Sequence, residues 1–112
     1  MISREKLAQE YIEIINSYYP VASRLLRHCL LKVLTINSSH LKKNLYYIGI
    51  YYPDRIGRSL LEQQDIFRDT AENMGLLEVA FFNANHLVKD PHSTIRKQDF
   101  RFWLELCWIA NQ

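Results

Sequence analysis

The segment from Ser93 to Gln112 constrains the fold most, because as a helix it would be apolar around most of its circumference. Its polar residues form only a narrow ridge: Lys97, Arg101, Glu105 and Gln112. The apolar residues occupy a broad arc around the rest: Ile95, Phe100, Phe102, Trp103, Leu104, Leu106, Cys107 and Ile109. Such a helix is normally buried by neighbours on several sides, so we predict that it lies at the centre of the fold.

Trp108 departs from this pattern, because its helical angle places it in the middle of the polar ridge. A large aromatic side chain in that position predicts contact with another segment, a second subunit or a partner. The alternative is a tryptophan that lies flat on its own surface, since isolated exposed apolar residues are ordinary.

The composition predicts one folded domain that covers residues 1–112. A hydrophobic content of 48% beside 23% charged residues argues against disorder. With only three glycines and three prolines, the chain has few of the residues that the many tight turns of an all-β sandwich require. Helices are therefore favoured.

The first half of the chain shows two helical patterns that meet at Pro20. Ser3 can cap a first helix, in which apolar residues recur at helical spacing as far as Tyr19. Pro20 disfavours a helical conformation in the residue before it and is well placed to begin a second helix. We predict that the second helix runs roughly over 21–35.

The middle of the chain is ambiguous at 45–52 and 76–83, where apolar and β-forming residues also fit helical spacing. Two parallel strands there would not form a stable sheet alone. We therefore predict an all-α fold, a compact antiparallel bundle of five or six helices with the apolar C-terminal helix at its centre. The alternative is an α+β fold with short strands near 45–52 and 76–83.

Four apolar residues fall on otherwise polar faces of the predicted helices, and together they predict a protein interface: Leu31, Val79, Phe82 and Trp108. A symmetric dimer would bury the same patch on both copies. The preferred hypothesis is a small non-enzymatic regulatory or adaptor protein, which acts by binding another protein and forms a homodimer.

Nucleic-acid binding is the second hypothesis, because residues 14–53 contain no acidic residue and carry a charge of +5. The cations of this basic stretch are Arg24, Arg27, Lys32, Lys42 and Lys43. Tyrosines border the stretch, and basic side chains near aromatic rings suit phosphates and stacked bases. The total charge of +2 is small for such a protein, so this hypothesis remains the alternative.

An enzyme is the third hypothesis, and we expect no catalytic residue, metal or cofactor. The histidines lack the spacing of metal ligands, and His28 and Cys29 point about 100° apart on a helix. Two distant cysteines within apolar runs predict buried thiols in a reducing compartment. The charged opening residues do not resemble a secretory signal, and the uncharged runs are too short to span a membrane. A cytoplasmic protein is therefore expected.

Overall fold

The computed structural model, which describes residues 2–40 and 43–112, has an α+β fold with a three-stranded sheet. The first half contains α1 (Arg4–Tyr18), α2 (Pro20–Leu26), β1 (Leu30–Ser38) and β2 (Lys43–Tyr52). Then come the 3-10 helix η1 (Asp54–Ile56), α3 (Gly57–Glu62), α4 (Gln64–Asn73) and β3 (Val79–Asn83). The chain continues with α5 (Ala84–Lys89), α6 (Ile95–Gln98) and α7 (Phe100–Ala110).

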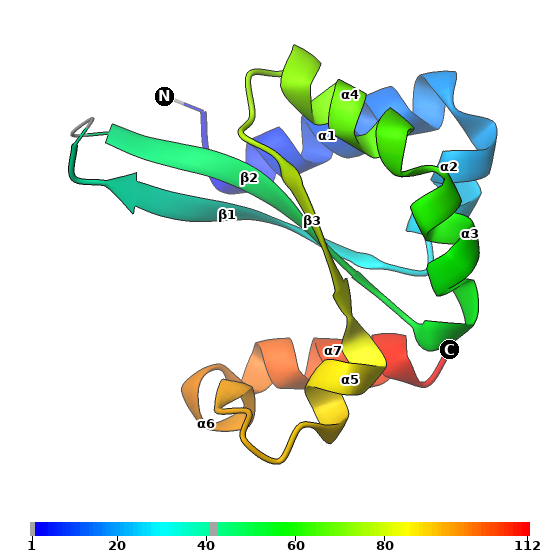
Figure 1. Ribbon diagram of the computed structural model, residues 1–112, viewed down its shortest axis with the longest axis vertical. Coiled ribbons are helices and arrows are strands. Elements are labelled where there is room, and N and C mark those ends of the chain that lie inside the picture. The colour runs from blue at the N-terminus through cyan, green and yellow to red at the C-terminus, as the bar shows by residue number, and fades with distance from the viewer. Residues whose placement is uncertain (1, 41–42) are drawn as a thin grey trace.

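The sheet is mixed, and β2 is its central strand. β1 and β2 form an antiparallel hairpin whose register runs from Leu30 opposite Tyr51 to Ser38 opposite Lys43. β3 pairs parallel to β2, after a crossover through α3 and α4. Figure 1 views the sheet close to edge-on, with α1 and α4 on one side of it and α5 and α7 on the other.

Each face of the sheet packs against its own hydrophobic core. Between the sheet and α1 to α4, the buried residues include Tyr11, Ile15, Ile48, Ile50, Leu60 and Phe67. The core on the other face is smaller and consists of Tyr51, Ala84, Leu106 and Ile109. The ring of Tyr51 stacks on Phe82 at a centroid distance of 4.9 Å and meets the edge of Phe102 at 5.0 Å. These aromatic contacts anchor α7 to the end of β2.

The predicted all-α bundle is wrong, because residues expected in its second helix form β1 instead. The helix that begins at Pro20 ends at Leu26, and Leu30–Ser38 pairs with β2 along its whole length. The alternative α+β prediction was closer, since Lys43–Tyr52 and Val79–Asn83 are strands. β1 removes the objection to two isolated parallel strands, because three strands with covered faces can be stable.

The C-terminal helix does not lie at the centre of the fold. The segment divides at Asp99, whose carboxylate caps α7 by accepting the N–H of Phe102 at 3.0 Å. α7 is the outer layer on its face of the sheet, and its inner side buries Leu106 and Ile109. Because no further helix covers it among the described residues, the rest of its apolar arc reaches solvent.

We expect Tyr11→Phe to lower the free energy of unfolding by about 1–2 kcal/mol, because the buried Tyr11 hydroxyl donates to the Phe67 carbonyl at 2.8 Å. Burial also raises the pKa of Tyr11 above its ordinary value of 10.0. The unfolded chain therefore releases this proton near pH 10 while the folded chain keeps it, so stability falls as the pH rises beyond 10.

Urea denaturation at about pH 8 measures the loss from the missing hydrogen bond, and a second series at about pH 10.5 measures the alkaline loss of stability. The Tyr11 contribution to the alkaline loss should be roughly 0.8 kcal/mol at the higher pH and should be missing in the phenylalanine variant. Equal alkaline losses in the two proteins would contradict this assignment. Tyr51 adds to the alkaline loss in both proteins equally, because burial and then the neighbouring Tyr47 raise its pKa to about 12.

Candidate protein-binding surface

The outer edge of β1 presents unpaired backbone groups, and the pairing of β2 shows which residues carry them. The Ile48 N–H donates to the Glu78 carbonyl at 2.9 Å, and the Tyr46 carbonyl accepts the Leu77 N–H at 2.8 Å. The even-numbered residues of β2 therefore direct their backbone groups toward β3. Its odd-numbered residues direct them toward β1.

The antiparallel register then assigns the backbone groups of β1. Its even-numbered residues, such as Lys32 and Leu34, bond to β2. Leu31, Val33 and Thr35 direct their N–H and C=O groups away from the sheet. Within residues 2–40 and 43–112, no hydrogen bond satisfies these outward groups. β1 is thus an open edge for strand pairing, along which Thr35 is exposed, Leu31 is half-buried and Val33 is buried.

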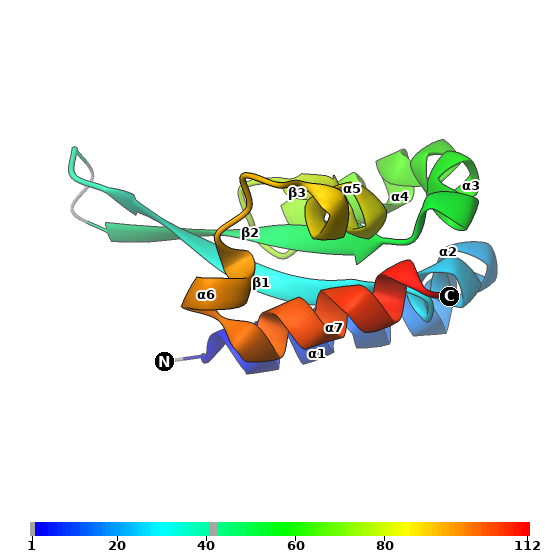
Figure 2. The same ribbon diagram turned by 90° about the horizontal axis from the view of Figure 1, so that it is seen from below.

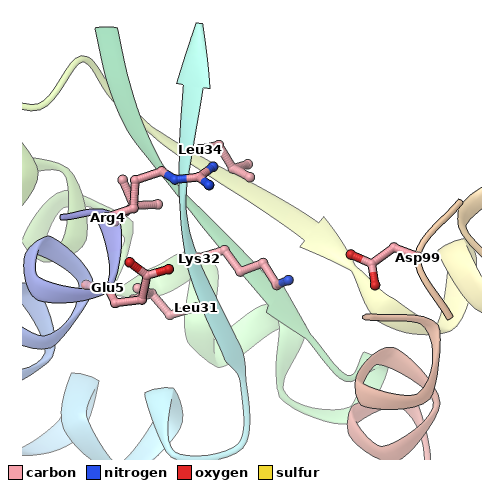
Figure 3. A pocket seen from close by; sticks show the side chains of 8 residues that line it. Arg4, Glu5, Leu31, Lys32, Leu34 and Asp99 are labelled. Atoms are coloured by element: carbon pink, nitrogen blue, oxygen red, sulfur yellow. The ribbon is translucent and has the colours of Figure 1, made fainter. Parts of the chain in front are cut away.

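Two helices flank this open edge from opposite faces of the sheet. α1 and α7 lie on opposite sides of the sheet in Figure 1, and both lie beyond β1, away from β2, in Figure 2. Between them is a hollow of about 400 Å³. Figure 3 shows Arg4 and Glu5 on one side of it and Asp99 on the other. Ala8 and residues 31–34 complete its lining.

Two further hollows continue along the same edge. One of about 400 Å³ lies between α7 and the start of β1, lined by Cys29, Leu30, Leu104 and Trp108 among others. Another, of about 190 Å³, lies toward α1 and α2, and shares Cys29 and Leu31 with its neighbours. The three hollows follow residues 29–34, and we call them together the β1 groove.

The charges around the hollow between α1 and α7 cancel one another. Arg4 and Glu5 come from the first turn of α1, Lys32 is the third residue of β1, and Asp99 is the N-cap of α7. The Lys32 ammonium lies 4.1 Å from the centroid of the Phe102 ring, a cation–π contact that holds its side chain on the α7 side. Because two cations face two anions, the hollow suits a neutral ligand rather than a polyanion.

α7 exposes a row of large apolar side chains opposite its buried side. Phe100, Leu104 and Trp108 are 54%, 53% and 67% exposed and stand at i, i+4 and i+8. We call this row the α7 ridge. Leu104 and Trp108 also line the hollow at the start of β1, so the ridge and the β1 groove form one continuous surface.

The four residues predicted at a protein interface fall in two different environments. Trp108 belongs to the α7 ridge, and Leu31 lines the β1 groove. Phe82 is half-buried and stacks on Tyr51, while Val79 is only 4% exposed in the core. The structure therefore places Trp108 and Leu31 at different hollows of the β1 groove, leaves Phe82 half-buried and encloses Val79 in the core.

The described cations of the predicted basic stretch do not gather at one site. Arg24 and Arg27 are exposed on and just after α2, whereas Lys32 lies near the start of β1 against Phe102. Lys42 and the side chain of Lys43 lie outside the described part of the chain. The arrangement of the described cations therefore provides no continuous track for a phosphate backbone.

Sequence reasoning missed the α7 ridge and the open edge. It assigned Phe100 and Leu104 to the buried arc, although their spacing from Trp108, at i, i+4 and i+8, was a readable signal. The open edge had no such signal, because it depends on the pairing of β1 with β2 and on two distant helices.

Nucleophilic chemistry has little support at Cys29. Burial raises the pKa of Cys29 to about 12, and its thiol donates to the Leu25 carbonyl at 3.5 Å. A protonated, hydrogen-bonded thiol is a poor nucleophile. Within the described ranges, no group of three His, Cys, Asp or Glu residues could hold a metal ion. Nor is any described helix both long and apolar enough to cross a membrane.

No protein-family model, curated protein or solved structure matches this chain.

We expect amide hydrogen exchange to alternate along β1. The outward N–H groups of Leu31, Val33 and Thr35 should exchange roughly 100-fold or more faster than those of Lys32 and Leu34, which bond to β2. Exchange followed by two-dimensional NMR measures each residue separately. Uniform protection along the strand would show that the outer edge is already covered in solution.

Proposed function

We propose that this chain is a small non-enzymatic protein-binding module that acts as a regulator or adaptor and associates with itself. The α7 ridge carries this proposal, because it places three large apolar side chains in water on the face of a helix. Water-exposed apolar rows of this kind are typical of protein interaction sites.

Burial of the ridge supplies the driving force. Complete burial of a large apolar side chain is worth about 1.5–3 kcal/mol, so covering one that is half exposed contributes about 1 kcal/mol. Phe100 and Trp108 add the aromatic contact area that dominates many interfaces. The hollow beside Leu104 and Trp108 offers a recess into which a partner side chain can pack.

The ridge is also complementary to itself. If two α7 helices pair antiparallel about Leu104, then Phe100 of each copy lies opposite Trp108 of the other, and Leu104 meets its own counterpart. The contact would place the same residues of both copies at the interface, as a two-fold axis requires. A homodimer through α7 follows from this arrangement.

We expect Leu104→Glu to convert the dimer into a folded monomer, because the interface would have to bury two carboxylates at its centre. Light scattering coupled to size exclusion measures the mass, and circular dichroism checks the fold. Leu77→Glu is the matched control, since Leu77 is also 53% exposed but precedes β3, outside the α7 ridge.

The control should stay dimeric, and Trp108→Glu should behave like Leu104→Glu. A wild-type protein that is monomeric at all accessible concentrations would contradict self-association through the ridge. A dimer that survives both α7 substitutions would place the contact on another surface.

A further inference from the structure

We propose that the β1 groove binds an extended peptide segment of another protein, which joins the sheet as a fourth strand beside β1. The inference rests on the proposed function in taking a protein as the ligand, but it concerns the open edge of the sheet rather than the α7 ridge. Strand addition of this kind gains its affinity from main-chain hydrogen bonds and its specificity from flanking pockets.

The backbone of β1 supplies the first requirement. Leu31, Val33 and Thr35 each present one donor and one acceptor at the outer edge, unpaired within the described residues. These groups repeat every second residue, which is the spacing at which an adjoining strand offers its own N–H and C=O groups. Bases, lipids and globular side-chain surfaces do not reproduce this row, whereas an extended main chain does.

The flanking helices select a peptide rather than a second copy of the chain. α1 and α7 both lie beyond β1, on opposite faces of the sheet (Figures 1 and 2), and the hollow between them has a volume of about 400 Å³. A copy docked edge to edge would be related by an axis perpendicular to the sheet, which keeps each face on its own side. Its α1 would then meet the first α1 on the same face of the sheet, whereas a single extended peptide brings no helix with it.

The lining of the β1 groove sets the side-chain pattern of the ligand. Toward α1, the hollow presents Ala8 and Leu31, beside which apolar side chains are favoured, and Arg4 and Glu5 from the first turn of the helix. Toward α7, it presents Leu34 together with Lys32 and Asp99, and polar side chains of either sign are favoured beside the last two (Figure 3). Because strand residues alternate between faces, the expected ligand alternates apolar and polar residues and is close to neutral.

The test uses a display library of eight-residue peptides in which valine, leucine or isoleucine occupies every second position, with a composition-matched scrambled library beside it. The full chain should enrich the alternating library over the scrambled one. Enriched peptides should then be retested for binding to variants at Thr35, which is exposed and whose N–H points outward.

Thr35→Pro removes an outward donor without removing any bond to β2, and proline is tolerated on an edge strand in that orientation. Thr35→Val keeps the donor and is the matched control. Binding should fall at least tenfold in the proline variant and stay within about twofold in the valine variant, the tenfold loss corresponding to about 1.4 kcal/mol. If the proline variant does not fold, Ala8→Phe closes the hollow from α1 and should reduce binding in the same way.

Three results would overturn the inference: equal enrichment of both libraries, peptide binding unchanged by both Thr35→Pro and Ala8→Phe, or a dimer that Thr35→Pro dissociates. The last would show that a second copy covers the edge. A negative result for peptide binding is distinguishable from a negative result for self-association. The effect of Leu104→Glu is measured as the mass of the protein, and this substitution leaves the backbone of β1 intact.

Discussion

The fold depends on β2, which is paired on both edges and packed on both faces. Its even-numbered residues, including Ile48 and Ile50, enter the core under α1 and α4. Its odd-numbered residues face the opposite way, and Tyr51 among them is buried in the core under α7. Gly49 keeps this second face flat, since a Cβ there would lie 2.8 Å from a methyl carbon of Leu34. The two helical layers are therefore connected through one strand, and a register shift in it would exchange the side chains of both cores.

The parts of the fold that could be predicted from sequence are those that local chemistry determines. Ser3 caps α1 by accepting the Lys6 N–H at 3.1 Å, as expected. Gly75 follows α4 with a φ of +78°, the left-handed conformation that glycine adopts most easily. Pro20 begins α2, as its lack of an N–H permits. Each of these features depends on a few neighbouring residues.

The predictions that were wrong concern features that depend on residues far apart in the chain. Residues 30–36 contain leucines at helical spacing, but Leu31 and Val33 also alternate with residues of the opposite face. Pairing with β2 favours the strand, and that pairing cannot be read from residues 30–36 alone. The same distinction between local and distant residues applies to the candidate site. Trp108 was visible as an anomaly on one helix, whereas the β1 groove combines segments from three parts of the sequence.

The position of Lys32 also bears on aggregation. A second identical edge that approached this strand of nine residues would bring the two α1 helices together on one face, and Lys32 adds an electrostatic cost to the same approach. Lys32 is the third residue of that strand, and its ammonium is held over the Phe102 ring. Two such edges that approached with Lys32 opposite its own copy would place like charges directly across the ladder, which is destabilising. One lysine can thus oppose self-assembly of the edge while the backbone beside it stays open to a different chain.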